Sequence, residues 1–390
     1  MTDLQVGVVG MGARSELGVF ADRPGEGSVV GVVCDNDPVS LDRNGAQYPN
    51  ARRVLDYREM FDLGLDAVIV LTPDWTHEAI AVDFLEHGVA CFLEKPIAIT
   101  TAGADRILQT ARATGTRLYV GHNMRHMPVV TQLRDLIRAG EIGEVKTIWC
   151  RHFVGNGGDY YFKDWHAERR HVNSLLLQKA AHDIDVIHWL ADGYTRKVSA
   201  FGDLCVYGQV TDRRSRAGEL MEDWFSEDNW PPLAQEGLNP VIDVEDLSVV
   251  NMMLDNGVIA TYQQCHFAPD YWRNYTVIGT EGRIENFGDH GGDVIKLWNR
   301  RHGDFFPEGD KSFAIEDPDG SHGGADPRLI AEFLQVVRGQ AKSTTSPVGA
   351  REAVATGCAA ADSLRAGGVL TDVPEVPADV VAYFADRTLG

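Results

Sequence analysis

The first 124 residues alternate short runs of β-branched residues with helix-like segments, and this alternation constrains the fold more than any other feature. The runs are LQVGVVG, SVVGVVCD, DAVIVL, VACFLE and RLYVGH, which start at residues 4, 28, 66, 89 and 117. Strands that alternate with helices predict a doubly wound parallel sheet, whose ligands bind beyond the carboxyl ends of the strands. Candidate binding residues are therefore those that follow each run.

A glycine pair follows the first run and matches the start of a dinucleotide-binding fingerprint. Gly10 would form a tight turn, Gly12 would let the backbone approach a pyrophosphate, and Ser15 holds the third position of the fingerprint. Asp35 ends the second run, a little beyond the expected spacing of about 20 residues. Its carboxylate would bind the ribose hydroxyls of NAD and repel the 2′-phosphate of NADP, although Arg14 would soften that preference. An aspartate that only starts the following turn remains the alternative.

The ends of the later runs complete a predicted cofactor site. The predicted cofactor-binding residues are Gly10, Gly12, Ala13, Arg14, Asp35, Thr72, Pro73, His77, Glu94, Lys95 and Asn123. NAD is the expected cofactor, and NADP is disfavoured. Lys95 emerges at the crevice because Pro96 prevents the strand ladder from continuing past it. A salt bridge between Lys95 and Glu94 is the alternative, but adjacent strand residues point to opposite faces, so that pairing is geometrically poor.

Five segments, GVVGMG, LTPDWTHEAIA, FLEKPIA, GHNMRHMP and HDID, follow one another in this order along the chain. Together they resemble the Gfo/Idh/MocA family, the group of glucose-fructose oxidoreductase and the inositol dehydrogenases, over essentially the whole chain. The resemblance implies a two-domain NAD(P)-dependent oxidoreductase that acts on sugars, cyclitols or glycosides. It also implies a homodimer or homotetramer assembled through the carboxy-terminal sheet.

After Met127 the pattern changes to one helix followed by repeated strands with turn signals between them. We therefore expect an α/β dinucleotide-binding Rossmann domain over residues 1–124 and an α+β domain over residues 125–390. The second domain is expected to be built on a large, open, mainly antiparallel sheet flanked by helices. Residues 209–243, rich in Trp, Pro and acidic residues, are predicted to form an inserted ordered loop or lid.

The segment SLLLQKAAHDIDVIHWLAD, residues 174–192, is predicted to be one helix. At about 100° per residue, one stripe carries the polar and aromatic residues and the opposite stripe is apolar and would pack inward. The first stripe is Gln178, His182, Asp185 and Trp189. Such a stripe could simply meet water, but a solvated face usually carries Lys and Glu. The preferred interpretation is a face that lines a site.

Lys95 and His182 are the predicted catalytic residues. A histidine can cycle a proton near neutral pH without a large pKa shift, and a desolvated lysine near a cationic nicotinamide would have a lowered pKa and could donate to the same alcohol oxygen. In relatives of the family, an aspartate commonly stands four residues before this histidine and takes part in catalysis. Gln178 stands there in this chain and cannot titrate, so Lys179 and Asp185 are candidates for that role. Asp185 could instead orient His182 or bind a substrate hydroxyl.

The outer substrate site is predicted from aromatic and hydrogen-bonding side chains, which suit sugars. The predicted substrate-binding residues are Gln178, Lys179, Asp185, His266, Tyr271, Arg273, Trp165, Arg169 and His322. The aromatic residues among them fit the core between sheet and helices equally well, and His322 fits the first turn of a helix equally well. No His-x-x-x-His or His-Glu-x-x-His spacing supports a metal site, and none is expected.

Composition narrows the classes of partner. The formal net charge of −21 disfavours nucleic acids and anionic membrane surfaces, which bind clustered Lys and Arg. Six widely separated cysteines fit a reducing compartment. The first strand begins almost at once and leaves no room for a cleavable leader, so a cytoplasmic location is expected.

The sequence thus favours an NAD-dependent oxidoreductase that transfers hydride between the cofactor and a secondary hydroxyl of a sugar, cyclitol or glycoside. One alternative is a glycosidase that retains NAD and cleaves its substrate by transient oxidation and elimination. Another is a non-catalytic sensor that keeps the nucleotide. Steady NADH release from a free sugar separates the first possibility from the other two.

Overall fold

The computed structural model describes residues 2–316 and 321–389, and its amino-terminal part is a six-stranded sheet in which all paired strands are parallel. The strands run in the order β3-β2-β1-β4-β5-β6. Their bounds are β1 (Leu4–Val9), β2 (Ser28–Cys34), β3 (Arg52–Val54), β4 (Ala67–Val70), β5 (Ala90–Glu94) and β6 (Leu118–Gly121). This order confirms the predicted doubly wound sheet. The short strand β3 has no counterpart among the runs found in the sequence.

The carboxy-terminal part is built on a nine-stranded sheet in the order β14-β13-β12-β11-β7-β10-β9-β8-β15. Its strands are β7 (Val145–Phe153), β8 (Thr195–Asp203), β9 (Leu247–Leu254), β10 (Ile259–Cys265), β11 (Trp272–Gly279), β12 (Arg283–Phe287), β13 (Val294–Trp298), β14 (Lys311–Ala314) and β15 (Thr371–Asp372). Neighbouring strands are antiparallel except for the central pair β10 and β7, which is parallel. The predicted open, mainly antiparallel sheet is confirmed.

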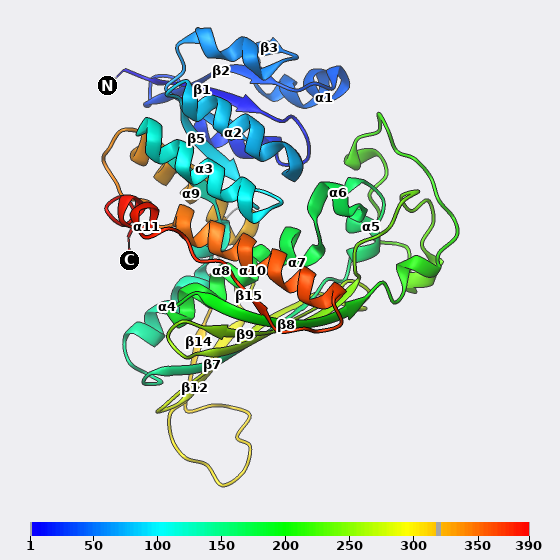
Figure 1. Cartoon of the computed structure of the whole chain (residues 1–390), viewed down its shortest axis with the longest axis vertical. Helices are drawn as coiled ribbons and strands as arrows, with labels where there is room; N and C mark the ends of the chain where they lie inside the picture. Colours follow the sequence, from blue (N-terminus) through cyan, green and yellow to red (C-terminus); the bar gives the residue numbers. More distant parts are fainter. Residues whose placement is uncertain (1, 317–320, 390) are drawn as a thin grey trace.

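Helices connect and cover the two sheets (Figure 1). The α-helices are α1 (Pro38–Arg43), α2 (His77–Glu86), α3 (Thr101–Thr114), α4 (Pro128–Arg138), α5 (Gly157–Tyr161), α6 (Arg169–Val172), α7 (Leu175–Gln178), α8 (Ala180–Ala191), α9 (Ser321–Val337), α10 (Pro347–Arg365) and α11 (Ala378–Ala385). The 3₁₀ helices are η1 (Ser15–Ala21), η2 (Asn44–Gln47), η3 (Tyr57–Leu63), η4 (Asp74–Thr76), η5 (Asn123–His126), η6 (Trp165–Ala167), η7 (Tyr207–Gln209), η8 (Met221–Asp223) and η9 (Pro232–Ala234).

The first sheet is closed by helices from both ends of the chain. On one face α2 and α3 bury Phe84 and Ile107, and α10 and α11 join them in the same apolar cluster. On the other face η1 and α9 pack together and bury Leu17 and Phe333. The segment after the glycine pair is thus a 3₁₀ helix, and the carboxy-terminal helix α9 supplies most of the cover on that face.

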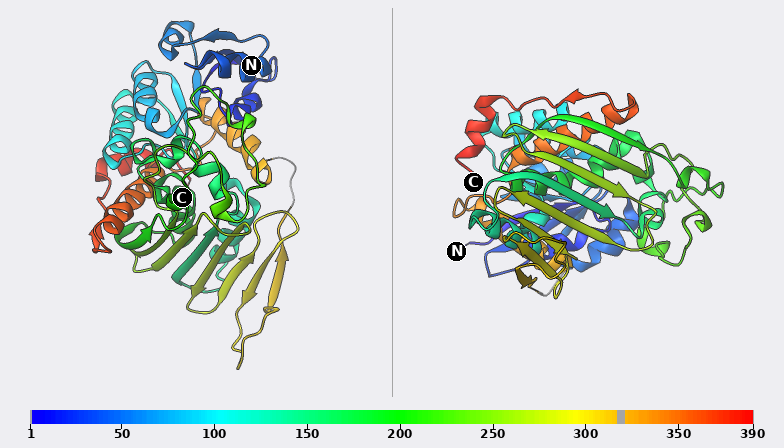
Figure 2. Two further views of the ribbon diagram at one scale, coloured as in Figure 1. Left: turned by 90° about the vertical axis from the view of Figure 1, so that its right-hand side faces the viewer. Right: turned by 90° about the horizontal axis from the view of Figure 1, so that it is seen from below.

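The nine-stranded sheet has one covered face and one open face. Helices α4, α8 and α10 pack on the covered face, where Leu133, Ile184 and Ala353 belong to its apolar core. Seen from below in Figure 2, the strands lie in front of the helices, so no helix among the described residues covers the other face. Within the described ranges, no helix is both long and apolar enough to cross a membrane.

The predicted helix over residues 174–192 is interrupted. α7 ends at Gln178, α8 begins at Ala180, and Lys179 lies between them. The Gln178 carbonyl accepts a hydrogen bond from the Lys95 ammonium at 3.4 Å. The break therefore places the Gln178 carbonyl oxygen and the Lys179 side chain at the ends of the strands of the first sheet.

Candidate active site

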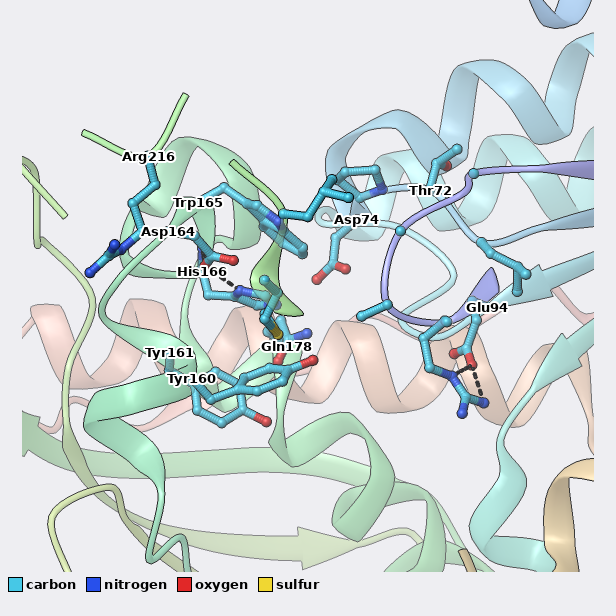
Figure 3. A pocket seen from close by; sticks show the side chains of 18 of the residues that line it. Thr72, Asp74, Glu94, Tyr160, Tyr161, Asp164, Trp165, His166, Gln178 and Arg216 are labelled. Atoms are coloured by element: carbon cyan, nitrogen blue, oxygen red, sulfur yellow. Dashed lines mark hydrogen bonds and ion pairs between the residues drawn. The ribbon is translucent and has the colours of Figure 1, made fainter. Parts of the chain in front are cut away.

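One cavity of about 740 Å³ lies beyond the carboxyl ends of the parallel strands and extends to α7 and α8 (Figure 3). Among the predicted site residues, the cavity is lined by Gly10, Gly12, Ala13, Arg14, Asp35, Thr72, Pro73, Glu94, Lys95, Asn123, Trp165, Gln178, Lys179 and His182. The two parts of the predicted site, from the glycine loop and from the carboxy-terminal helix, therefore share a single space.

The glycine loop fits the approach of a pyrophosphate. Gly10 has φ of +102°, and a Cβ there would lie 2.7 Å from the Leu71 carbonyl carbon, so only glycine is accommodated without strain. A Cβ on Gly12 would meet nothing within 4 Å, so this position is open where a phosphate would approach. Asp35 accepts the Met11 backbone N–H at 2.7 Å and the Asp37 N–H at 2.8 Å. Its carboxylate thus both forms the local turn and fixes the glycine loop.

Arg14 does not offer a free charge to a 2′-phosphate. Its guanidinium donates to Glu94 at 3.0 and 3.1 Å and to Asp326 at 2.9 and 3.2 Å. The expectation that Arg14 softens the preference for NAD is therefore corrected, because its guanidinium is already bound by the carboxylates of Glu94 and Asp326. The arrangement also ties the glycine loop to the end of β5 and to α9.

His77 lies outside the cavity and acts as a support. Its Nδ1 is 2.7 Å from the Pro96 carbonyl oxygen and its Nε2 is 2.8 Å from the Thr72 carbonyl oxygen. The ring is fully buried and bridges the loops that follow β4 and β5. The prediction that His77 contacts the cofactor is thus corrected. Its ring instead sets the position of Thr72 and Lys95 relative to each other.

Lys95 points into the cavity from the end of β5. Its side chain makes no ion pair with Glu94, whose carboxylate instead accepts the Lys95 backbone N–H at 2.7 Å and the Arg14 guanidinium. Burial lowers the pKa of Lys95, and the charges of Arg14 and Arg273 lower it further, against the opposing effect of Glu94 and Asp74. The ammonium is therefore a better proton donor than an exposed lysine.

His182 lines the cavity from the first turn of α8. Burial and the charges of Lys95, Lys179 and Arg273 hold its pKa well below the usual range. The expectation of a histidine without a large pKa shift is therefore wrong. Its Nδ1 is buried and has no hydrogen-bond partner in the part of the chain that the structure describes. At neutral pH the ring is uncharged and can accept a proton.

Lys179 also lines the cavity, from the break between α7 and α8. Its ammonium lies over the Tyr161 ring, 5.7 Å from the centroid. Burial and the charges of Arg273 and Lys95 lower the pKa of Lys179 to about 7. Lys95 and Lys179, which both have lowered pKa values, therefore both lower the pKa of His182.

Asp185 does not line the cavity, which corrects all three of its predicted roles. Its carboxylate accepts two hydrogen bonds from Arg125 at 2.7 Å each and lies 3.2 Å from Nδ1 of His122. Trp189, on the same stripe, packs beside the guanidinium of Arg125. The four residues of the stripe do not all line the cavity, because Arg125, on η5, binds Asp185 and packs against Trp189.

The residues near β11 form a charged network behind the cavity. Arg273 contacts Asp183 at 3.1 Å and Asp289 at 3.6 Å, and Tyr271 donates to Asp289 at 2.6 Å. His266 is buried and packs edge-on against Tyr161. The prediction that Arg273, Tyr271 and His266 line the substrate site is therefore wrong. They lie behind the cavity and support the residues that line it.

Two further predicted substrate residues are placed elsewhere. Arg169 is largely exposed and pairs with Glu245 at 2.8 Å, so it does not line the cavity. His322 lies in the first turn of α9, and its side chain falls outside the described residues.

Several cavity residues were not predicted from the sequence. They are Asn36, Ser40, Leu71, Asp74, Asn156, Tyr160, Tyr161, Asp164, His166, Glu168, Ser215, Arg216, Ala217, Glu219, Leu220, Met221, Trp224 and Asn239. Figure 3 shows Tyr160, Tyr161 and His166 grouped on the side of the cavity opposite Glu94. Asp74 directly follows the predicted Thr72 and Pro73, so its position after β4 was the available signal.

The inserted segment reaches the nucleotide end of the cavity. Ser215, Arg216 and Trp224 line the same space as the glycine loop. In Figure 1 this green loop rises beside the first sheet, and Asp223 pairs with Arg43 of α1 at 2.8 Å. Among the described residues, no group of three or more His, Cys, Asp or Glu side chains is arranged to hold a metal ion.

Comparison with known proteins places this geometry among oxidoreductases. Residues 4–122 match the model of the oxidoreductase family with an NAD-binding Rossmann fold, and residues 130–285 match the GFO/IDH/MocA C-terminal domain. A Bacillus subtilis protein named as an oxidoreductase, YteT, is 24% identical over 344 residues, 77% of this chain and 80% of that protein. Inositol 2-dehydrogenase of Burkholderia multivorans is 32% identical over 192 residues, 48% of this chain and 54% of that enzyme. The chain thus spans about half the length of that dehydrogenase.

Solved structures share the fold over nearly the whole chain. Levoglucosan dehydrogenase in complex with NADH and levoglucosan has a TM-score of 0.78 at 18% identity, with 96% of this chain and all of that chain (100%) covered. The WlbA dehydrogenase from Bordetella pertussis, in complex with NADH and UDP-GlcNAcA, has a TM-score of 0.75 at 18% identity, with 95% and 98% covered. At this identity the likeness establishes the architecture.

Proposed function

Because the chain belongs to the Gfo/Idh/MocA family of oxidoreductases and begins with an NAD-binding Rossmann domain, we propose that it oxidises a secondary hydroxyl of a sugar, cyclitol or glycoside. The observation that carries the proposal is the meeting of Lys95 and His182 in one cavity with the glycine loop. Lys95 comes from the first sheet and His182 from α8, and the Lys95 ammonium reaches the carbonyl of Gln178, one turn before His182.

NAD, bound along the glycine loop and Asp35, would supply the hydride acceptor. Residues of the protein would remove the proton of the substrate hydroxyl. The uncharged His182 ring accepts that proton, and Lys95 donates a hydrogen bond to the same oxygen and stabilises negative charge that develops on it. A positioned acid or base contributes about 10²- to 10⁴-fold in rate, so both groups should affect turnover strongly.

The aromatic side of the cavity supports a sugar-like substrate. Tyr160, Tyr161 and Trp165 line it, and His166 stacks on Trp165 with ring centroids 3.6 Å apart. Aromatic rings give a sugar apolar contact, while their hydroxyl and imidazole groups offer hydrogen bonds. The neighbouring levoglucosan and UDP-GlcNAcA complexes are consistent with this substrate class.

The test is a screen of NAD reduction over aldoses, inositols, amino sugars and glycosides, with the products identified by mass spectrometry. We expect steady NADH formation and one keto product for at least one class. Release of an aglycone without accumulation of NADH would contradict the proposal and favour the NAD-retaining glycosidase. Tight NAD binding without any turnover would favour a sensor.

We expect Asp35→Asn to raise the NADP to NAD ratio of kcat/KM by about tenfold, because it removes a like charge from the place where a 2′-phosphate would sit. The amide oxygen can still accept the Met11 N–H, so the glycine loop should keep its position, although the Asp37 N–H loses its acceptor. Steady-state kinetics with each cofactor would measure the ratio. An unchanged ratio would show that Asp35 serves only the local turn.

We also propose that the open face of the nine-stranded sheet forms a homodimer or homotetramer interface. Trp149, Phe201, Met253, Ile259 and Ile278 are exposed on that face, and Ile259 pairs directly with Met253. Exposed apolar patches of this kind mark interaction surfaces.

Sedimentation velocity should therefore give a mass that is two or four times 42.9 kDa. Ile259→Glu should shift the protein toward the monomer, because it places a charge among the exposed apolar residues of this face. Val381→Glu on α11 is the matched control, since Val381 is also exposed but lies away from the sheet. A monomeric wild-type protein would reject the proposal.

A further inference from the structure

The ammonium of Lys179 has no ion-pair partner in the cavity. Within residues 2–316 and 321–389 it has no hydrogen bond or ion pair, and it lies over the face of the Tyr161 ring. A face-on aromatic ring attracts a cation but does not neutralise it. Leaving a desolvated ammonium unpaired is unfavourable, so the presence of a lysine at this position calls for a functional explanation.

The carboxylates nearest to Lys179 are already engaged. Asp183 is fully buried and binds Arg273 at 3.1 Å and His152 at 2.9 Å. Asp289 accepts the Tyr271 hydroxyl. Both acids also attract Lys179 and raise its pKa, but neither carboxylate forms an ion pair with it, and the charges of Arg273 and Lys95 lower that pKa.

Three other acids of the cavity are also occupied. Glu94 is held by Arg14, Asp164 lies 2.5 Å from His166, and Glu168 pairs with Arg170 at 2.7 Å. Asp74 is buried, and its charge opposes the lowering of the Lys95 pKa, but it forms no ion pair with Lys179 in the part of the chain that the structure describes. The end of the cavity near His182 therefore carries two ammonium groups, to which bound NAD would add a cationic ring.

On the basis of the proposed dehydrogenase activity, we propose that Lys179 binds an anionic group of the substrate, which is therefore an acidic sugar carrying a carboxylate or a phosphate. The anion would supply the counter-charge that the protein does not provide. It would lie over the aromatic side of the cavity, beside Tyr161, while the reacting hydroxyl meets Lys95 and His182. Lys179 then acts in substrate specificity, and the hydroxyl proton passes through the other two residues.

The competing role for Lys179 is that of a second base, in place of the carboxylate that Gln178 lacks. The reacting oxygen already has a donor in Lys95 and an acceptor in His182, so a further base has no proton to take. An un-ionised sugar would also leave the two ammonium groups uncompensated. Both arguments favour the anion-binding role.

Isothermal titration calorimetry on the full-length protein saturated with NADH tests the proposal directly. Glucuronate, galacturonate and glucose 6-phosphate are compared with glucose and galactose at pH 7, in two buffers of different ionisation enthalpy. Because burial lowers the pKa of Lys179 to about 7, a bound anion that stabilises the ammonium should draw in a fraction of a proton at this pH. A neutral sugar should draw in none. The uronates and the sugar phosphate report separately on a carboxylate and a phosphate.

The variant Lys179→Met removes the charge and keeps a side chain of similar length beside Tyr161. We expect it to weaken binding of the acidic sugar by about 10- to 100-fold, to abolish the proton uptake and to leave neutral sugars unchanged. Lys197→Met is the matched control, because Lys197 is exposed and pairs with Asp372 on the surface. The control should bind acidic sugars like the wild type.

The proposal is overturned if no acidic sugar binds more tightly than its neutral counterpart, or if its binding takes up no proton in the wild-type protein. It is also overturned if Lys179→Met slows turnover of neutral and acidic sugars equally, as a base would require. Binding needs no turnover, so a failure of the dehydrogenase proposal would show separately, as acidic-sugar binding without any NADH formation from NAD. The wild-type proton uptake remains a test even if the variant does not fold.

Discussion

Replacing Lys95 with methionine is expected to lower kcat by about 10²- to 10⁴-fold while the KM for the sugar changes by less than about tenfold. The ammonium lines the same cavity as the ring of His182, and burial lowers its pKa, which favours proton donation. Losing it removes stabilisation of the charge that develops on the reacting oxygen. Methionine fills a similar volume, so the cavity walls should keep their positions.

Steady-state and single-turnover kinetics on the best substrate of the screen would measure this effect. Lys146→Met is the matched control, because Lys146 is an exposed lysine on β7 far from the cavity, and it should retain wild-type kcat. Removing a desolvated charge should not lower the melting temperature of Lys95→Met, so lost activity would not reflect unfolding. A kcat within threefold of wild type would exclude Lys95 from the chemistry.

The second large effect is expected on stability, from Asp185→Asn. This change should lower the free energy of unfolding by about 3–5 kcal/mol, because it leaves the buried Arg125 guanidinium without its charged partner. Chemical denaturation would measure it. The double variant Arg125→Met with Asp185→Leu should recover much of the loss, since two apolar side chains need no counter-charge. A loss below about 1 kcal/mol would mean that the pair contributes little.

The same variant has a defined pH dependence. Burial alone raises the pKa of Asp185, but Arg125 and His122 hold it far below the usual range. A carboxyl with a lowered pKa in the folded state stabilises the fold above its unfolded pKa of about 4, and this contribution is lost as the pH falls below that value. The difference in stability between wild type and Asp185→Asn should therefore be full at pH 7 and shrink on acidification below about pH 4.

Much of the fold followed from local patterns. The runs that start at Leu4, Ser28 and Val89 became three parallel strands, which end at Val9, Cys34 and Glu94, because a β-branched run followed by a turn has few other low-energy conformations. The family and the NAD-binding domain were also predicted correctly from short motifs. The residues at the strand ends reached the cavity because topology alone brings the carboxyl ends of parallel strands together.

Predictions for the second half of the site were less complete. Periodicity grouped Gln178, His182 and Asp185 on one stripe, but the helix breaks at Lys179 and Arg125 binds the last of the three. The partner lies 60 residues away in sequence, so no local window contains it. The inserted loop was predicted, but the residues through which it lines the cavity were not, and neither were Tyr160 and Tyr161, since their roles depend on where long loops fold back.

The sequence by itself determined the parallel sheet, the glycine loop with Asp35 and the emergence of Lys95 at the end of β5, because strand ends and tight turns depend on neighbouring residues. Tertiary structure alone decided which charges are paired. Arg14 is bound by Glu94 and Asp326. Lys179 has no ion-pair partner among the described residues, and its pKa is lowered. Pairing and desolvation depend on distances between segments far apart along the chain, and these distances control the chemistry of the site.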